Sequence, residues 1–287
     1  MILINPISPA AFSIFGFDVR WYALAYVAAF VIGFWLFKKL SGTSDYGPKL
    51  SKKQFDDLFA AIILGVIVGG RLGYVLFYNL SFFLAHPLEI FALWNGGMSF
   101  HGGMLGVIAS VFLFSIKMQK HSAGVDKHNI SSLLALRSSF SILDLMAVVA
   151  PIGLFFGRIA NFINMEVMGR VTDKPWGVVF NGHDALPRHA SPLYEAASEG
   201  ILLFIIMFAL WCRTPLRRYA GALSGLFGML YAVLRIFCEQ FREPDAQIGF
   251  LTGWGLTMGQ LLSGLMLVAG AVIFAVAVRK KLSRGHE

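Results

Sequence analysis

Three arginines lie inside long apolar stretches of the sequence, where a charged side chain is costly. Arg71, Arg158 and Arg235 each interrupt a run of mostly hydrophobic residues, and by residue count they fall at similar depth. A charge in a lipid environment costs at least about 2.5 kcal/mol and usually marks a functional position. Because a guanidinium binds two phosphate oxygens at once, the three arginines predict a site for an anionic ligand.

Polar residues with helical spacing accompany two of these arginines. One series has four members, each four residues after the last: Tyr231, Arg235, Glu239 and Glu243. On a helix they would share one face, which must point away from lipid. A second series follows Arg158 and consists of Asn161, Asn164 and Glu166. Two interpretations stay open: a buried Arg–Glu network that only holds helices together, or an anion site.

A histidine between glycines is the candidate for proton transfer. His101 lies within the glycine-rich segment Gly96–Gly103. An unperturbed imidazole has a pKa of about 6.5, which suits proton transfer at neutral pH. The glycines beside it, like Gly69, Gly70 and Gly73 around Arg71, permit either close helix packing or close approach of a ligand. No metal-ligand spacing and no nucleotide fingerprint occurs, so we predict neither a metal nor a cofactor.

The composition of the chain indicates an integral membrane protein. Of the 287 residues, 57% are hydrophobic and 14% are charged, far from the balance of a soluble domain. Apolar runs predict about seven spanning helices: Trp21–Phe37, Leu58–Tyr78, Met98–Ile116, Ile142–Phe162, Leu193–Cys212, Tyr219–Phe241 and Leu256–Val278. We therefore predict an all-α integral membrane protein that forms a single polytopic membrane domain over residues 1–287.

Basic residues predict the orientation of these helices. They cluster after the first, third and fifth spans and at the C-terminal end, and such clusters stay in the cytoplasm. The N-terminus is then periplasmic and the C-terminus cytoplasmic. Residues of about 163–192 form a periplasmic loop or small cap, with a short strand within Trp176–Phe180, and Ser81–Trp94 lies along the outer leaflet. Because the net charge of +8 resides in these clusters, no nucleic-acid partner is expected.

The series after Arg158 belongs to a longer segment that resembles a known family. Gly157–Gly169, with the sequence GRIANFINMEVMG, is similar to the signature of the bacterial prolipoprotein diacylglyceryl transferases. Further similar segments follow the family's order: Arg20–Tyr22, Gly70–Tyr74, Met98–Gly103, Tyr231–Arg235, Glu239 and Arg242–Asp245. Within Arg188–Glu195 the family more usually has Pro after the His and Gln before the Leu.

The resemblance implies a multi-pass transferase of the bacterial inner (cytoplasmic) membrane, surrounded by membrane lipids. Such an enzyme moves the diacylglyceryl group of phosphatidylglycerol to the lipobox cysteine in the signal peptide of a prolipoprotein. This first step of lipoprotein maturation forms a thioether and releases glycerol phosphate. The implied catalytic residues are His101, Arg158 and Arg235. The implied substrate-binding residues are Tyr22, Arg71, Asn161, Asn164, Glu166, Gly169, Tyr231 and Glu239. For His101, the roles of general base and of head-group ligand both stay open.

Two other classes of protein fit the same polar residues: a secondary transporter for an anionic amphiphile, and a noncatalytic lipid-binding or scaffold protein. A transporter should carry polar residues through the inner half of its spans, whereas that half of spans three, four and five is nearly all apolar. This favours the transferase. Its own thiols are poor nucleophiles, because Cys212 lies at the cytoplasmic end of a span and Cys238 points about 100° away from Glu239.

The predicted orientation can be measured with topology reporters. A reporter that works only in the cytoplasm should be active when it is fused after residue 284. A reporter that works only in the periplasm should be active when it is inserted near residue 182, because the basic clusters remain in the cytoplasm. The opposite pattern of reporter activity would overturn the orientation.

Overall fold

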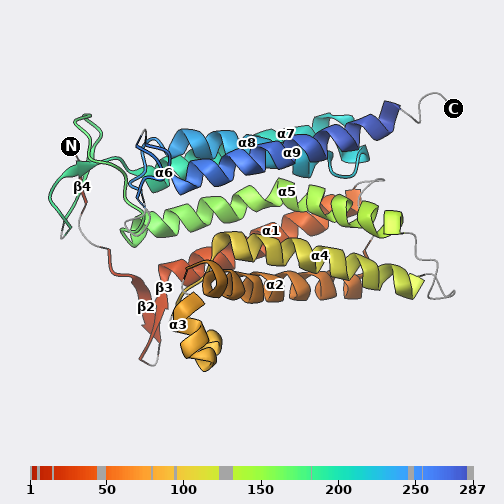
Figure 1. Ribbon diagram of the computed structural model, residues 1–287, viewed down its shortest axis with the longest axis horizontal. Coiled ribbons are helices and arrows are strands. Elements are labelled where there is room, and N and C mark those ends of the chain that lie inside the picture. The colour runs from red at the N-terminus through yellow and green to blue at the C-terminus, as the bar shows by residue number, and fades with distance from the viewer. Residues whose placement is uncertain are drawn as a thin grey trace. The chain divides into compact units, whose positions relative to one another are not determined.

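The computed structural model of the protein describes residues 2–4, 7–14, 16–43, 50–78, 80–93, 96–122, 132–181, 183–244, 249–253 and 255–282. Trp94, Asp245 and the side chain of His101, all used above, lie outside this description. The chain forms two compact units: unit 1 comprises Met1–Thr43 and Asp144–Glu287, and unit 2 comprises Ser44–Leu143. Both are mainly helical (Figure 1).

Every predicted span contains a helix. The helices are α1 (Trp21–Thr43), α2 (Lys52–Tyr78), α4 (Phe100–Ser122), α5 (Ser132–Ile163), the continuous series α6 (Ser191–Glu195), η3 (Ala196–Leu202) and α7 (Leu203–Arg213), α8 (Ala222–Cys238), and α9 (Met258–Leu282). In the described part of the chain, six of these helices are long and apolar enough to cross a membrane. The seventh, α8, has 17 residues. The all-α membrane fold is confirmed, while the number of spans and their orientation stay predictions.

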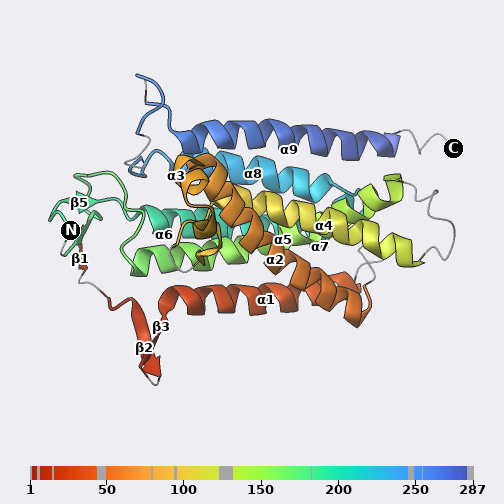
Figure 2. The ribbon, with the colours of Figure 1, turned by 60° about the horizontal axis from the view of Figure 1, so that its bottom comes forward.

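In unit 1, helices α1, α7, α8 and α9 and the C-terminal part of α5 run along a common direction (Figures 1 and 2). The α8 helix is shorter than predicted because Gly221, with a φ of 98°, turns the chain immediately before it. Asp144 of α5 joins α8 at that point: its carboxylate accepts hydrogen bonds from the backbone nitrogens of Gly221 (2.8 Å) and Ser224 (2.7 Å). A buried carboxylate thereby binds the amide groups that begin α8.

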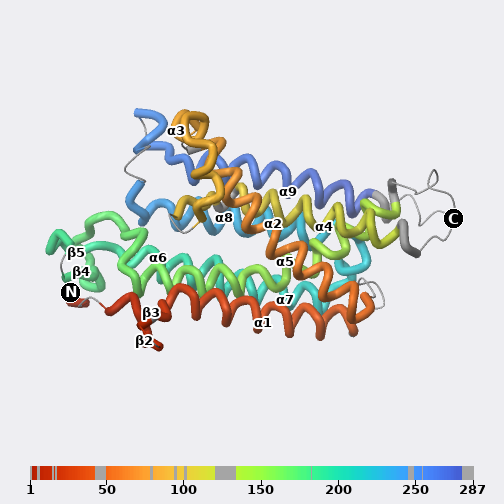
Figure 3. The backbone as a smooth tube through the Cα atoms, turned by 90° about the horizontal axis from the view of Figure 1, so that it is seen from below, coloured from red at the N-terminus to blue at the C-terminus, as the bar shows by residue number. Residues whose placement is uncertain are grey.

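A small sheet lies at one end of unit 1. Strand β1 (Ile2–Ile4) pairs in parallel with β4 (Val178–Phe180), and β4 pairs in antiparallel with β5 (Pro187–Arg188). The strand predicted within Trp176–Phe180 is therefore confirmed, although its pairing with the N-terminal residues was not foreseen. A hairpin of β2 (Ala10–Ile14) and β3 (Phe17–Arg20) leads into α1. In Figure 3 this sheet and the last turns of α9 lie at opposite ends of the unit.

Unit 2 contains α2, α3 (Leu80–Ala85), a 3₁₀ turn η1 (Pro87–Phe91) and α4. Helices α2 and α4 pack through a stripe of glycines: Gly65, Gly69 and Gly73 on α2, and Gly102 and Gly106 on α4. A Cβ atom on Gly106 would lie 2.0 Å from the carbonyl oxygen of Gly65. Close backbone approach through small residues is the usual way membrane helices associate. Helix packing, one of the two interpretations left open above, is what the structure shows for Gly69, Gly73 and Gly102.

The close packing of α2 against α4 predicts that a side chain at Gly106 lowers the stability of the protein. Gly106→Ala should lower the thermal unfolding temperature of the detergent-solubilised protein, because the added methyl group overlaps backbone and overpacking costs about 1–3 kcal/mol. Gly103→Ala is the matched control on the same helix, since its Cβ would lie 3.7 Å from the nearest atom. Equal unfolding temperatures for the two variants would contradict the packing.

Candidate functional site

Two arginines and three glutamates form a buried network of ion pairs in unit 1. Arg158 comes from α5, Glu195 and Glu199 from the α6–η3 segment, and Arg235 and Glu239 from the end of α8. Nε of Arg158 lies 2.7 Å from Oε2 of Glu195, and its Nη2 lies 3.6 Å from Oε2 of Glu199. Nη1 of Arg235 lies 3.0 Å from Oε2 of Glu195 and 3.5 Å from Oε1 of Glu199. Nη2 of Arg235 lies 2.8 Å from Oε2 of Glu239.

Glu195 and Glu199 are the residues that the sequence analysis missed as members of the site. Both glutamates have fully buried side chains against the two guanidiniums. A third guanidinium is close, since Nη1 of Arg242 lies 3.9 Å from Oε1 of Glu195. The sequence signal that could have identified the two glutamates is their spacing of four residues inside an apolar run. The same spacing linked Arg235 with Glu239.

A π-helical segment begins directly after Glu195 and contains Glu199. Residues Ala196–Leu202 (η3) widen the helix between α6 and α7, and such segments are rare and frequent at functional sites. Gly200 within η3 allows close contact with α5, because a Cβ there would lie 2.7 Å from Cβ of Phe155. The close approach of η3 to α5 places Glu199 beside Arg158.

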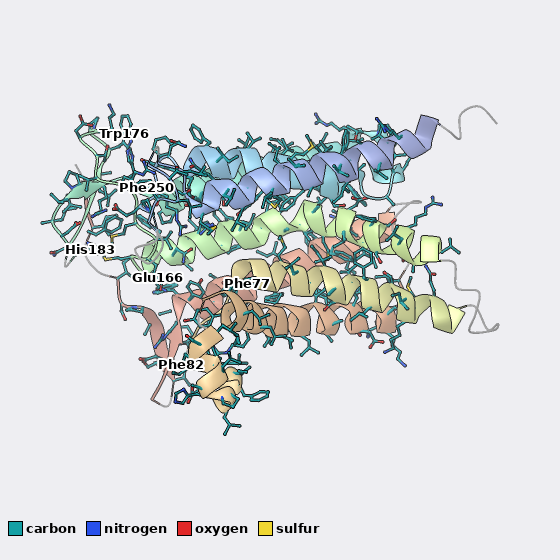
Figure 4. The ribbon with its side chains drawn as sticks, viewed as in Figure 1. Phe77, Phe82, Glu166, Trp176, His183 and Phe250 are labelled. Carbon is teal, nitrogen blue, oxygen red and sulfur yellow. The ribbon has the colours of Figure 1, made fainter. Side chains whose placement is uncertain are left out.

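The chain leaves α5 in a strained turn around Glu166. The two neighbours of this residue, Met165 and Val167, have φ values of 54° and 58°, a left-handed conformation that is uncommon for any side chain and unusual for β-branched valine. Nδ2 of Asn161 donates to Oε2 of Glu166 at 3.1 Å, and Nδ2 of Asn164 approaches Oε1 at 3.4 Å. The turn thus brings together three predicted site residues. Figure 4 shows Glu166 at this end of α5, on the same side as Trp176 and His183.

Gly169 lies where three segments of backbone meet. Its nitrogen donates to the carbonyl of His189 at 3.1 Å, and it pairs with Arg242 in an isolated antiparallel bridge. A Cβ atom would lie 2.2 Å from the carbonyl oxygen of His189 and 2.8 Å from that of Phe241. Backbone packing therefore excludes a side chain here, and a role of Gly169 in substrate binding stays a prediction.

Arg188 connects the backbone at Gly169 with Asp184 and Glu243. Its Nη1 donates to the carbonyl of Gly169 at 3.0 Å and to Oε2 of Glu243 at 2.6 Å, while its Nε donates to Asp184 at 2.8 Å. The guanidinium of Arg188 lowers the pKa of Asp184 to about 2. Glu243 was predicted to share the helical face of Arg235. That prediction was wrong, because α8 ends at Cys238 and Glu243 lies beyond it.

Glu239 connects the ion-pair network with α9. Its Oε1 accepts a hydrogen bond from Oγ1 of Thr257 at 3.0 Å. Thr257 and Gln260 form a capping box for α9, in which each side chain accepts from the other's backbone nitrogen, at 3.2 and 3.1 Å. Tyr231, one turn before Arg235, is buried. The predicted residues Tyr231, Arg235 and Glu239 therefore do share one buried region.

A tyrosine pair on α1 accompanies the site. The hydroxyl of Tyr26 donates to that of Tyr22 at 3.3 Å, and the ring centroids are 5.0 Å apart. Tyr26 interacts electrostatically with Arg158 and Glu166. Tyr22 is thus linked through Tyr26 to the end of α5, and Tyr26 is a third residue that the sequence analysis missed.

Arg71 and His101 belong to unit 2. The guanidinium of Arg71 donates to five backbone carbonyls, those of Glu89, Ile90, Ala92, Gly96 and Gly97. Its five N–H groups are therefore used within the unit, and they hold the segment that leads into α4. His101 lies in the first turn of α4. Substrate binding by Arg71 and catalysis by His101 stay predictions.

A pocket of about 440 Å³ in unit 1 is lined mostly by apolar side chains: Trp176, His189, Tyr194, Ala197, Ser198, Leu202, Phe237 and Phe241. Nδ1 of His189 lies 3.2 Å from the hydroxyl of Tyr194. Burial, with a further contribution from Lys174, lowers the pKa of His189, against the opposing charge of Asp173. In the described residues, no group of three or more His, Cys, Asp or Glu side chains could hold a metal ion.

Known proteins match almost the whole chain. Residues 9–276 match the family model described as prolipoprotein diacylglyceryl transferase. The chain belongs to this family. A phosphatidylglycerol–prolipoprotein diacylglyceryl transferase of Rhodospirillum rubrum is 49% identical over 276 residues, which cover 96% of this chain and 94% of that protein. The proteins of the same name from Methylocella silvestris and Paramagnetospirillum magneticum are 47% and 45% identical, and each match covers 96% of this chain and 95% of the relative.

Family membership confirms the resemblance that the segment Gly157–Gly169 predicted. This segment contains Arg158 of the ion-pair network, the strained turn at Glu166, and the glycine that the surrounding backbone requires. The family signature therefore coincides with the part of unit 1 where the buried charges meet the small sheet.

The network predicts that arginine is required for its shape as well as its charge. Arg158→Lys and Arg235→Lys should each lower the rate of diacylglyceryl transfer by about 100-fold or more, since one ammonium cannot replace a planar fork that contacts several oxygens. Transfer is measured per folded protein in lipid micelles. Arg217→Lys, in the 3₁₀ turn Pro215–Arg218 that follows α7, is the matched control. Near-parental rates in both site variants would mean that positive charge alone suffices.

Proposed function

We propose that this chain transfers the diacylglyceryl group of phosphatidylglycerol to the thiol of the lipobox cysteine in a prolipoprotein. The reaction forms a thioether and releases glycerol phosphate. The observation that carries the proposal is the pair Arg158 and Arg235, the first half-buried and the second buried, both held in place by Glu195 and Glu199, in a chain of this family. Guanidiniums fixed in advance at the developing charge are the kind of group that stabilises a departing phosphate.

The remaining residues of unit 1 have supporting roles in this proposal. Asn161, Asn164 and Glu166 are held together in the turn after α5, where they orient the lipid head group. Glu239 keeps Arg235 in place, Tyr231 is buried and interacts electrostatically with Arg235, and Tyr22 reaches the same region through Tyr26. Each of these groups is already hydrogen-bonded or packed, so little rearrangement is needed when the substrate binds.

His101 is proposed as the base for the substrate thiol or, alternatively, as a ligand of the head group. A free thiol has a pKa of about 8.5 and is mostly protonated at neutral pH, so its attack needs a base or a positive environment. Arg71 supports this residue within unit 2, because it holds Gly96 and Gly97 immediately before α4. The backbone nitrogen of Ser99 also donates to the carbonyl of Gly70 at 2.8 Å.

The location that fits this reaction is the bacterial inner membrane, with the network facing the periplasm. Phosphatidylglycerol is a membrane lipid, and in the described residues six apolar helices of the chain are long enough to cross a membrane. In unit 1, β1 and the last turns of α9 lie at opposite ends (Figure 2), which supports termini on opposite sides of the membrane.

The decisive experiment mixes the purified protein with phosphatidylglycerol and a lipobox peptide, and measures the peptide by mass spectrometry. We expect a mass gain of one diacylglyceryl group. Replacing the peptide's cysteine with serine should abolish the gain. The double variant Cys212→Ala, Cys238→Ala should retain most activity, because Cys238 is buried against Ser198 Oγ at 3.0 Å and Cys212 lies near the end of α7.

Two outcomes would contradict parts of this proposal. An absence of mass gain in every detergent and bilayer would favour a transporter of anionic amphiphiles over a transferase. A folded but inactive double cysteine variant would place the nucleophile in this protein instead of its substrate.

A further inference from the structure

The arginines that the proposed function assigns to phosphate already have carboxylate partners. Oε2 of Glu195 lies between Nε of Arg158 at 2.7 Å and Nη1 of Arg235 at 3.0 Å. The carboxylate of Glu199 touches the same two guanidiniums at 3.6 and 3.5 Å. Neither glutamate side chain has exposed surface. A phosphate that enters this site therefore meets guanidiniums that two carboxylates already occupy.

The charge balance counts the side chains that ion pairs of 4.0 Å or less join to the two glutamates, directly or through Arg235. Beyond Arg158 and Arg235, these are Arg242 at 3.9 Å from Glu195 and Glu239 at 2.8 Å from Arg235. Arg170 is nearby, but its guanidinium donates to the backbone carbonyls of Arg242 and Glu239 at 2.9 and 3.5 Å. Tyr231 and Cys238 also interact electrostatically with both glutamates, and both are neutral in their ordinary forms at pH 7. These ion pairs thus join three guanidiniums to three carboxylates, and the formal charges of the six groups cancel before any ligand binds.

A phosphate anion added to a neutral buried network leaves one negative charge without compensation. An unpaired charge in a poorly solvated site is costly, and such sites usually neutralise it by taking up a proton. Glu195 and Glu199 both lie within ion-pair distance of the same Nη1 of Arg235. Two carboxylates that share one site readily hold a single proton between them.

We infer that phosphatidylglycerol binds at this site together with one proton, which Glu199 accepts. The inference rests on the proposed function. The geometry selects Glu199 because it lies 3.6 and 3.5 Å from Arg158 and Arg235, whereas Glu195 lies 2.7 and 3.0 Å from the same two guanidiniums and also pairs with Arg242, so Glu199 loses less when its carboxylate becomes neutral. Once it is protonated, Glu199 no longer forms ion pairs with Arg158 and Arg235, and these guanidiniums bind the phosphate oxygens instead. The lipid's phosphate then takes the place of one protein carboxylate, and the charge of the site is unchanged.

The test measures proton uptake during lipid binding, with no peptide present. The protein is titrated calorimetrically with short-chain phosphatidylglycerol near pH 8, in buffers that differ in ionisation enthalpy. We expect about one proton taken up per lipid, and an affinity that falls by about tenfold per pH unit in this range, as linkage requires. Diacylglycerol, which has the same tails and no phosphate, should bind without proton uptake.

Glu199→Gln should remove the coupling. Glutamine resembles the protonated carboxyl group, so this variant should take up no proton and bind phosphatidylglycerol at pH 8 at least as tightly as the parent. Asp57→Asn, which removes an exposed carboxylate on α2, is the matched control and should keep the parental uptake. Uptake that persists in Glu199→Gln overturns the assignment.

The parent protein keeps the inference falsifiable even if that variant does not fold. Binding of phosphatidylglycerol to the parent without proton uptake overturns the inference. The proposed function fails separately, by an absence of mass gain on the lipobox peptide. A protein that modifies the peptide but binds its lipid without a proton refutes the coupling alone, and one that couples binding to a proton but modifies nothing refutes the transfer alone.

Discussion

The cost of burying charge among apolar helices is the constraint on which unit 1 depends. Arg158 and Arg235 are tolerated there because Glu195, Glu199 and Glu239 surround them at 2.7 to 3.6 Å. Removing one partner from such a network leaves an uncompensated buried charge, which is far more costly than losing a surface ion pair. The members come from three different parts of the chain, so the network also determines how α5, the α6–η3 segment and α8 pack.

The backbone around the network has unusual features that serve this arrangement. The π-helical turn of η3, the left-handed Met165 and Val167, and the close approach at Gly169 are each uncommon in ordinary helices and loops. Strained backbone persists only where surrounding contacts hold it, and it often occurs at functional sites. Here Arg188 and the small β1–β4–β5 sheet supply such contacts.

Unit 2 differs from unit 1 in how its helices pack and in how its buried arginine is neutralised. The glycine stripe between α2 and α4 gives close packing without polar groups. Arg71 satisfies its charge with five backbone carbonyls instead of carboxylates, and the same hydrogen bonds give partners to carbonyls of η1 and of Ala92, Gly96 and Gly97. A single arginine therefore links residues of η1 with Gly96 and Gly97, which precede the helical turn that carries His101.

The sequence by itself determined the membrane class, the positions of the helices and the family, because runs of apolar residues and the segment Gly157–Gly169 are local patterns. It also identified Arg158, Arg235, Asn161, Asn164, Glu166, Tyr231 and Glu239 as polar groups of one region. Only the tertiary structure decided which carboxylates neutralise the arginines, since Glu195 and Glu199 lie more than thirty positions from either guanidinium. The same holds for the pairing of β1 with β4 and for the glycine contacts of α2 and α4. Local periodicity shows which side of a helix is buried, whereas the partner of a buried group depends on contacts between distant segments.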